Sequence, residues 1–388
     1  MPANQELERA RVELKRIGAD FALLSTNENV TYVSHWAVPV EFGAFAAMRY
    51  EPPMAFIPVD DSASTLLVGD NQAAHAQAAH ALDAMHVHPV FALEERVPAR
   101  ENFLNALREV LRGAGVGSLR MKLAVEEKML PLVAARLLMT EFPNLELIEA
   151  GPALAAARLI KTDRELDLLR FAAEVNQAGH EELTRQCREA GRDEFAMWSA
   201  VQSAMESKAG APLFIFGELV TGKRVGVVNV PGGPLHVITQ PGDLALMDSS
   251  PRVNGYWSDT TNTQVIGGVE PTEKQRRYGT AAREAFYAAA DMLRPGRRAH
   301  EAFDAAKATF AKYGLQIGHY GGHQIGVAVN EDPRLVPYEQ AVVQAGMVFS
   351  IEPGSYEGAA GDTGARMEKS VIVHDSGPEI LCDFRWGF

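Results

Sequence analysis

Apolar and polar positions alternate in two different ways along the first part of the chain, up to about Pro152. Short apolar runs typical of strands occur in DFALLST, STLLVG and KLAVEE, and segments with helical spacing occur in ENFLNALREVLRGAG and LPLVAARLLMTEF. Strands that alternate with helices are typical of an α/β domain. The pattern therefore predicts an N-terminal α/β domain over residues 1–152.

A second domain is expected over residues 158–388, where two segments begin with the signature of a helix start. Thr162 is followed three residues later by Glu165, and Thr272 by Gln275, so each pair predicts a capping box. Two further helices are predicted in DEFAMWSAVQSAME and AHEAFDAAKATFAKYG. Because strand-like runs follow each pair of helices, this domain is expected to be α+β.

The stretch GDLALMDSSPRVNGYWSDTTNT alternates around an Asn-Gly dipeptide, which predicts a two-residue hairpin turn. The register of such a hairpin places Ser250 opposite Asp259, and Asp248 diagonally across from Asp259 on the same face. Two carboxylates this close on a buried face require a shared proton or a bound cation. A solvated surface hairpin is the alternative that this stretch alone leaves open.

A similar order of elements occurs again further along the chain. Glu352 lies six residues after Gly346, as Asp248 lies six residues after Gly242, and Glu368 lies in the strand-like run ARMEKSVIV. Two helices followed by a hairpin with one acid on each strand therefore occur twice. This repetition predicts an internally duplicated, pseudo-two-fold domain with four acids at its centre. Chance similarity of two hairpins is the alternative.

Charge and cysteine content limit the partners and the compartment. The net charge of -13 over 388 residues argues against nucleic acid or an anionic membrane as the main partner, and it is compatible with bound divalent cations. The two cysteines form no Cys-x-x-Cys pair, which favours a reducing compartment. Neither an apolar signal core nor an apolar run of membrane-spanning length is present, so a cytoplasmic protein is expected.

The glycine-rich segment IGHYGGHQIGVAVNEDP, between the two acidic hairpins, contains His319 and His323. Glycines allow the backbone to approach a ligand closely. Four carboxylates with one imidazole form an oxygen-rich set that suits manganese, cobalt or iron, or zinc with carboxylate ligands. Because a single divalent ion would leave excess negative charge buried, two divalent metal ions are expected.

The motifs LMDSSPRVNGYWSDTT, GGHQIG, SIEPG and ARMEK contain Asp248, Asp259, His323, Glu352 and Glu368. These five residues resemble, in order and context, the metal ligands of the pita-bread metallopeptidases, which include aminopeptidase P, prolidase and methionine aminopeptidase. The first domain is similar to the creatinase-type N-terminal domain of the aminopeptidase P and prolidase branch. The resemblance implies a dinuclear metal-dependent hydrolase of C–N amide bonds, with an Xaa-Pro dipeptidase or aminopeptidase P-like peptidase as the preferred hypothesis, and a homodimer.

The same resemblance implies a role for each ligand. Asp259 and Glu368 would bridge the two ions, Asp248 would bind the second ion, and His323 with Glu352 would bind the first. Two ions so placed acidify a bridging water to hydroxide and polarise a substrate carbonyl. Manganese is the preferred metal, with cobalt, zinc and iron as alternatives.

Three residues are catalytic candidates by resemblance. Glu352 would move a proton to the leaving amine, and His319 would contact the substrate and the developing oxyanion. Arg366 matches a family arginine near the active site. Its alternative role is that of a structural partner for one of the acids.

The chain departs from the family pattern outside the metal ligands. A histidine is usual where NEDP has Asn330, and another is usual upstream of the first aspartate, for which His236 and Asn229 are the candidates. The usual arginine of a Thr-Arg-Thr run is Asn262, and the usual acid after the last glutamate is Lys369. Strand alternation makes Asn262 point away from Asp259, so that change is interpreted as structural.

Because of these departures, the motifs do not identify the substrate. We expect a small peptide or a small-molecule amide, and His236, Asn330 and Trp36 are the candidate substrate contacts. Trp36 begins the aromatic-rich segment WAVPVEFGAFAAMRY, for which a place in the core or at a subunit contact is the alternative. A small-molecule hydrolase or lyase on the same fold, and a catalytically inactive binding homologue, are the rival functions.

Overall fold

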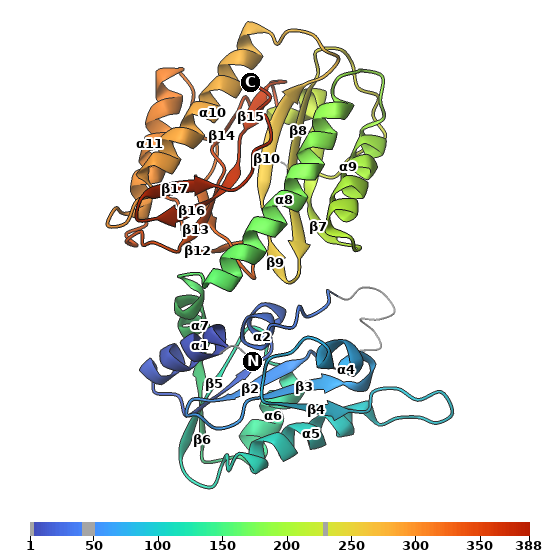
Figure 1. Ribbon diagram of the computed structural model, residues 1–388, viewed down its shortest axis with the longest axis vertical. Coiled ribbons are helices and arrows are strands. Elements are labelled where there is room, and N and C mark those ends of the chain that lie inside the picture. Colours follow the sequence, from blue (N-terminus) through green and yellow to red (C-terminus); the bar gives the residue numbers. More distant parts are fainter. Residues whose placement is uncertain (1–3, 41–50, 228–231) are drawn as a thin grey trace. The chain divides into compact units, whose positions relative to one another are not determined.

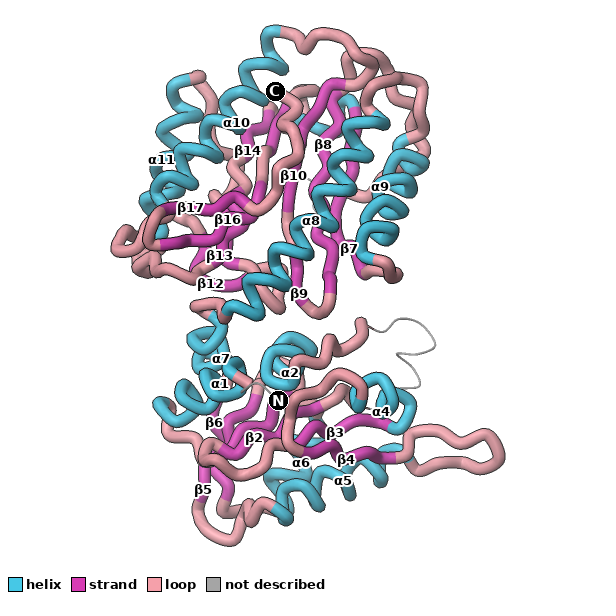
Figure 2. Tube along the Cα trace, in the orientation of Figure 1, coloured by secondary structure: helices cyan, strands magenta, loops and turns pink. Residues whose placement is uncertain are grey.

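The computed structural model describes residues 4–40, 51–227 and 232–388 of the chain. The chain forms two compact units, Met1–Leu159 and Ile160–Phe388 (Figure 1, Figure 2). Asn229 and residues 41–50 of the aromatic-rich segment lie outside the described residues. In the part of the chain that is described, no helix is both long and apolar enough to cross a bilayer.

The first unit is built on a mixed six-stranded sheet with strand order β4-β3-β2-β1-β5-β6. Its strands are β1 (Phe21–Leu24), β2 (Met54–Pro58), β3 (Thr65–Gly69), β4 (Ala84–His88), β5 (Met121–Val125) and β6 (Leu145–Glu149). Its helices are α1 (Gln5–Arg16), α2 (Asn27–Ser34), α4 (Asp70–Gln77), α5 (Ala99–Gly113), α6 (Leu132–Glu141) and α7 (Gly151–Arg158). Apolar side chains of α5 and α6, such as Phe103 and Leu137, pack against the strands in one core. Strands and helices thus alternate as the hydrophobic pattern predicts.

Trp36 belongs to the interior of this first unit. Its side chain is fully buried, and its indole Nε1 donates to Nδ1 of His75 at 3.0 Å. Burial of this kind matches the core alternative for Trp36 and leaves no indole surface for a substrate. The expectation of a substrate contact at Trp36 is therefore corrected.

The second unit begins with two helices and an antiparallel sheet of order β10-β8-β7, with β9 paired to β8. These elements are α8 (Asp163–Gln186), α9 (Glu194–Ala209), β7 (Phe214–Thr221), a 3-10 helix (Gly222–Gly226), β8 (Leu244–Val253), β9 (Tyr256–Trp257) and β10 (Thr260–Val265). Asn254 and Gly255 both have positive φ, 50° and 88°, as the predicted two-residue turn requires. Val253 pairs with Tyr256 and Ser249 with Thr260, so the predicted register is confirmed.

Two more helices and a second set of strands complete the unit. They are α10 (Glu273–Met292), α11 (Ala299–Lys312), β11 (Gly322–Gln324), β12 (Glu331–Arg334), β13 (Val348–Ile351), β14 (Gly354–Tyr356), β15 (Gly364–Arg366), β16 (Lys369–His374) and β17 (Gly377–Ile380). The pairs Ile351–Lys369 and Gly354–Arg366 share one register, which places Glu352 opposite Glu368. Helix, helix and acidic hairpin thus occur twice, and both predicted capping boxes are present.

The two halves of this unit meet along β10. The backbone N–H of Glu368 donates to the carbonyl of Thr261 at 2.9 Å, and the hydroxyl of Ser350 donates to the carbonyl of Asp259 at 2.8 Å. Each bond joins a residue of the first half to one of the second. The acids of both hairpins are thereby brought to one place.

The C-terminal segment, residues 382–388, lies on the side of these strands that faces away from the acids. Asn262 Nδ2 donates to the carbonyl of Arg385 at 3.0 Å, and the N–H of Gly387 donates to Asn262 Oδ1 at 3.1 Å. Lys369 Nζ donates to the carbonyl of Phe384 at 2.8 Å and lies over the rings of Phe384 and Trp386. Asn262 therefore has the structural role that strand alternation predicts.

Candidate metal centre

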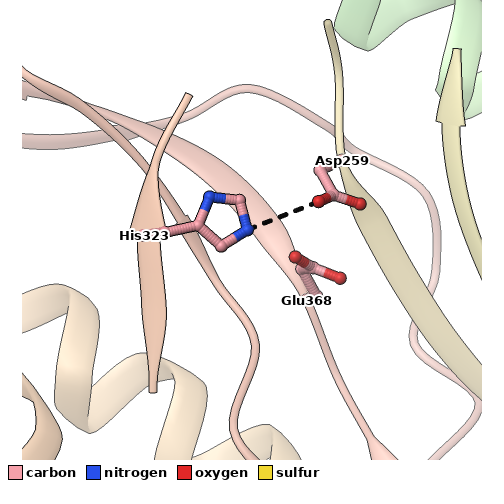
Figure 3. Close-up of side chains that lie close together, drawn as sticks. All are labelled: Asp259, His323 and Glu368. Carbon is pink, nitrogen blue, oxygen red and sulfur yellow. Dashed lines mark ion pairs between the residues drawn. The ribbon is translucent and has the colours of Figure 1, made fainter. Parts of the chain in front are cut away.

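Five side chains from both hairpins and from β11 converge in the interior of the second unit. Asp248 comes from β8 and His323 from β11. Asp259 directly precedes β10, Glu352 directly follows β13 and Glu368 directly precedes β16. Ligand atoms of Asp259, His323 and Glu368 all lie within 4.8 Å of one another (Figure 3). These three residues are buried, with exposed fractions of 8%, 1% and 1%. The aspartate hairpin is therefore not a solvated surface feature.

His323 presents one defined nitrogen to the acids. Its Nδ1 lies 2.8 Å from the carbonyl of Gln324, which can only accept, so Nδ1 bears the proton. Its Nε2 lies 3.3 Å from Glu352 Oε1 and 3.5 Å from Asp259 Oδ2. Burial opposes a charge on His323, but the two carboxylates raise its pKa well above the usual value. The same Nε2 is oriented to bind a cation in place of that proton.

Glu368 supplies the clearest test of whether a cation fits here. Thr261 Oγ1 donates to Glu368 Oε2 at 2.6 Å, whereas Glu368 Oε1 is buried with no hydrogen-bond partner among the described residues. Burial raises the pKa of the Glu368 carboxyl well above its usual value, and Asp259 adds to the rise. Burial likewise raises the pKa of Asp248. A divalent cation would satisfy the orphaned oxygen and offset the repulsion, so the residues fit a metal centre.

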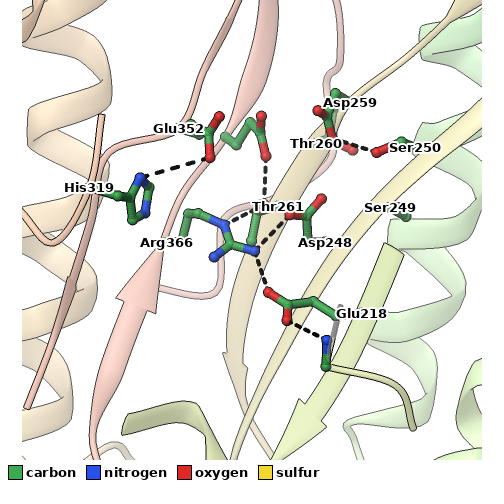
Figure 4. A network of polar contacts seen from close by, with 12 residues as sticks. Glu218, Asp248, Ser249, Ser250, Asp259, Thr260, Thr261, His319, Glu352 and Arg366 are labelled. Atoms are coloured by element: carbon green, nitrogen blue, oxygen red, sulfur yellow. Dashed lines mark hydrogen bonds and ion pairs between the residues drawn. The ribbon is translucent and has the colours of Figure 1, made fainter. Parts of the chain in front are cut away.

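Arg366 is engaged by polar groups on every side. Its guanidinium donates to Thr261 Oγ1 at 3.0 Å, to the hydroxyl of Tyr356 at 2.8 Å and to Asp248 Oδ2 at 2.7 Å. The same nitrogen that binds Asp248 also donates to Glu218 (Figure 4). The geometry therefore agrees with the structural-partner alternative for Arg366, whose partner is Asp248.

A cavity of about 240 Å³ opens onto these acids. The residues on its wall that the sequence singled out are Asp248, Asp259, His319, His323, Asn330, Glu352 and Arg366. Phe216, Tyr320 and Val329 add an apolar part to the same wall. The cavity is thus charged at one part and apolar at another, as a site for a small organic substrate requires.

His319 is neutral in this setting, because burial lowers its pKa. Its Nδ1 lies 2.8 Å from the carbonyl of Tyr320 and bears the proton, so Nε2 accepts from the hydroxyl of Tyr356 at 3.2 Å. The Tyr356 oxygen in turn accepts from Arg366. His319 therefore lies at the cavity wall, with Nε2 bound to Tyr356.

Two other residues singled out for substrate contact differ in position. Asn330 lies on the cavity wall, and its side chain hydrogen-bonds with Tyr320. The side chain of His236 is 81% exposed, with Nδ1 3.2 Å from Asp193 Oδ2, and His236 is not part of the cavity wall. The expectation of a substrate contact at His236 is therefore corrected.

Sequence reasoning missed Glu218, which lies next to the predicted site. Glu218 is 3% exposed and pairs with Asp248 across β7 and β8. The signal was a charged residue inside the otherwise apolar run FIFGELVT, on the strand that precedes the first ligand strand. An acid in such a run requires a buried partner, which here is Arg366.

A duplicated α+β unit that gathers four acids and a histidine, and that follows a separate α/β unit in the chain, defines a metal-dependent hydrolase of the pita-bread type. The model of the family Metallopeptidase family M24 matches residues 167–375, and that of the Creatinase/Prolidase N-terminal domain matches residues 6–160. The chain belongs to metallopeptidase family M24. The resemblance drawn from the motifs is thereby confirmed.

Individual proteins are similar over much of their length. The Xaa-Pro dipeptidase of Lactobacillus delbrueckii subsp. lactis is 33% identical over 261 residues, which cover 66% of this chain and 68% of that protein. The prolidase structure from Pyrococcus horikoshii OT3 has a TM-score of 0.78 at 22% identity, with 98% of this chain and 99% of that chain covered. The X-Pro aminopeptidase structure from Thermotoga maritima MSB8 has a TM-score of 0.79 at 20% identity, with 98% of each chain covered. These structures share the fold, and the family assigns the chain to the metal-dependent peptidases.

Proposed function

We propose that the chain is a dinuclear metallopeptidase that hydrolyses the C–N bond of small peptides with proline after the scissile bond. The observation on which this proposal rests is the cluster of Asp259, His323 and Glu368, in which Glu368 Oε1 has no hydrogen-bond partner among the described residues. Glu352 lies 3.3 Å from His323 Nε2, and Asp248 lines the same cavity wall. Asp248, Asp259, His323, Glu352 and Glu368 would hold two divalent ions. Four carboxylates balance the charge of two such ions, whereas one ion would leave two negative charges buried.

The ions, when bound, would supply an acidified water and polarise the substrate carbonyl. The chain's own residues would move the proton and position the substrate. Glu352 lies on the cavity wall, where its carboxylate can take a proton from the attacking water and return it to the leaving amine. His319 lies on the cavity wall, where it would contact the substrate beside the reacting carbonyl, and Tyr356 holds its ring at 3.2 Å.

Manganese is the proposed metal, with cobalt, zinc and iron as the alternatives, because oxygen-rich ligand sets suit these ions. A homodimer is proposed from family resemblance. A cytoplasmic location is proposed because the two cysteines, Cys187 and Cys382, are buried free thiols. Burial raises the pKa of each thiol to about 12, so both are unreactive near neutral pH.

The proposed substrate rests on two observations. The dipeptidase from Lactobacillus delbrueckii subsp. lactis, which is 33% identical, is named for Xaa-Pro dipeptides. In this chain Phe216, Tyr320 and Val329 give the cavity an apolar wall that suits a pyrrolidine ring.

A panel of dipeptides tests this proposal. Purified protein loaded with manganese is assayed with Xaa-Pro dipeptides and with matched dipeptides in which alanine replaces proline. We expect hydrolysis of the proline series at a higher kcat/KM than the alanine series, and none after Asp259→Asn. Hydrolysis of neither series by a metal-loaded protein would contradict the peptidase proposal.

A small-molecule hydrolase or lyase on the same fold is the second candidate. The observation that favours it is Asn330, an amide on the cavity wall where the family's peptidases usually have a histidine. An amide keeps hydrogen bonding but cannot exchange a proton near neutral pH. Retention of metal without turnover of any dipeptide in the panel would favour this candidate.

A further inference from the structure

Glu218 lies directly behind the metal centre, on the strand next to Asp248. It is 3% exposed and does not line the cavity, so no substrate can contact it. One oxygen of its carboxylate accepts from Arg366, and the other accepts from the N–H of Gly232 at 3.2 Å. Figure 4 shows Arg366 between the carboxylates of Glu218 and Asp248. A single guanidinium nitrogen is thus shared by a candidate metal ligand and by an acid outside the ligand set.

This sharing matters for the charge at Asp248. A guanidinium 2.7 Å from Asp248 Oδ2 competes with a cation for the negative charge of that carboxylate. It also places a positive charge close to where Asp248 would hold its ion. Glu218 supplies the opposite charge on the far side of Arg366. The pair of Arg366 and Glu218 is therefore neutral as a whole, and Asp248 keeps its charge for a cation.

The position of Arg366 matters as much as its charge. One of its other nitrogens donates to Thr261, and Thr261 in turn donates to Glu368. The remaining nitrogen donates to Tyr356, whose hydroxyl donates to His319. Rotation of the guanidinium would disturb contacts on both halves of the site. Glu218 opposes such rotation because it holds the same terminal nitrogen that donates to Asp248.

We propose that Glu218 is a positioning residue that sets the divalent-cation affinity of the centre at Asp248 by neutralising and orienting Arg366. The inference rests on the proposed function only in that the centre binds divalent cations. It does not depend on which substrate is cleaved.

The chain offers a matched control in Glu194. This carboxylate is also fully buried, pairs with Arg224, and accepts from Thr221 Oγ1 at 2.6 Å and from the N–H of Leu235 at 2.7 Å. Glu194 therefore holds the same loop that Glu218 holds through Gly232. Among the described residues, Glu194 forms no hydrogen bond or ion pair with Arg366 or with any of the five candidate ligands.

The test is calorimetric titration of chelator-stripped protein with manganese, for wild type, Glu218→Gln, Glu218→Asp and Glu194→Gln. We expect Glu218→Gln to bind at least one ion with an affinity lower by about tenfold or more. Changes to groups that support metal ligands weaken metal binding by about 10- to 100-fold. Glu218→Asp, which keeps the charge, is expected to bind more tightly than Glu218→Gln. Glu194→Gln is expected to bind within about twofold of wild type.

Two results would overturn the inference. One is wild-type metal affinity in Glu218→Gln. The other is a loss of metal affinity in Glu194→Gln as large as that in Glu218→Gln, because the loop held by both residues would then explain the loss. Should Glu218→Gln fail to fold, the comparison of Glu218→Asp with Glu194→Gln decides, since a weaker ion affinity in Glu194→Gln than in Glu218→Asp contradicts the proposal. A wild type that binds two ions but cleaves no Xaa-Pro peptide would refute the proposed substrate and leave this inference standing.

Discussion

Asn262 and Gly387 are joined on the side of β10 that faces away from the metal centre, where the N–H of Gly387 donates to Asn262 Oδ1 at 3.1 Å. The amide nitrogen of Asn262 donates to the carbonyl of Arg385 at 3.0 Å. Asn262 thus pairs with the backbone of the C-terminal segment much as a neighbouring strand would. A side chain that departs from the family pattern here has a structural partner in the same chain.

Asn262→Ala is expected to lower the free energy of unfolding by about 2 kcal/mol, because it leaves two partly buried backbone groups without these partners. Metal affinity is expected to stay close to that of wild type, since Asn262 faces away from the ligands. Urea unfolding of the metal-free protein measures the first quantity and calorimetry the second. Asn330→Ala, at an exposed position, is the control and is expected to change stability little. Equal stability of Asn262→Ala and wild type would contradict the assigned role.

His180 makes stability depend on pH. It is fully buried, bonded to Thr260 Oγ1 at 2.8 Å and stacked on Phe384, and burial lowers its pKa to about 3. In the unfolded chain the pKa of histidine is about 6.5. Below that pH the unfolded state takes up a proton that the folded state does not, so stability is complete above pH 6.5 and falls toward pH 3. The loss from this group is about 2 kcal/mol at pH 5.

Urea unfolding of the metal-free protein at pH 7 and pH 5 tests this prediction. Between pH 7 and pH 5 the free energy of unfolding is expected to fall less in His180→Gln, which cannot titrate, than in wild type, by about 2 kcal/mol. The difference between the two proteins isolates His180, because other titrating groups are common to both. An equal drop in both proteins would show that His180 is not the group responsible.

Removal of metal is expected to abolish hydrolysis and lower the midpoint of thermal unfolding, because it exposes the repulsion among buried acids. Two ions per chain are expected in the loaded wild type by elemental analysis. Asp248→Asn is expected to retain one ion, whereas Asp259→Asn, at the proposed bridging position, is expected to retain fewer than one. Two full ions in Asp259→Asn would contradict the bridging role.

His319→Ala is expected to lower kcat by about 100-fold with both ions retained, because it removes a side chain that would position the substrate at the cavity wall. Steady-state kinetics and metal analysis on the same sample separate these effects. Tyr356→Phe, which removes the hydroxyl bound to His319 Nε2, is the companion variant and is expected to lower kcat less. A loss of metal from His319→Ala would show instead that His319 supports metal binding.

Asn330→His restores the residue that is usual in the family's peptidases. The imidazole would lie beside Tyr320 on the cavity wall and could exchange a proton there. We expect kcat/KM for Xaa-Pro dipeptides to rise, by about tenfold, and to depend more steeply on pH between 5 and 8. A Gln at the same position keeps the amide and is expected to resemble wild type. No change in Asn330→His would show that position 330 does not govern the substrate.

The aspartate hairpin could be predicted in detail because its register depends only on local geometry. A two-residue Asn-Gly turn fixes which residues face each other, and Ser250 indeed donates to Asp259 Oδ1 at 2.8 Å. The order of strands and helices and the two capping boxes follow from equally local signals. The second hairpin has a long turn, so its register, with Glu352 opposite Glu368, required the structure.

The residues that surround the ligands could not be predicted, because their contacts join distant parts of the chain. Glu218 contacts Arg366, which is 148 positions away. His236 and Trp36 were expected near the substrate from their sequence context, yet His236 is exposed beside Asp193 and Trp36 is enclosed in the first unit. Sequence motifs identify the candidate metal ligands, whereas the groups that orient these ligands depend on tertiary packing.

The division of the ligands between two hairpins sets the order of events during biosynthesis. Translation produces Asp248 and Asp259 well before Glu352 and Glu368, and β10 must meet the later strands before Glu368 can reach Asp259. A nascent chain that lacks the second hairpin therefore offers an ion only the two aspartates of the first hairpin. The complete set of candidate ligands therefore exists only after the chain has been synthesised through Glu368 and the two halves of the second unit have met.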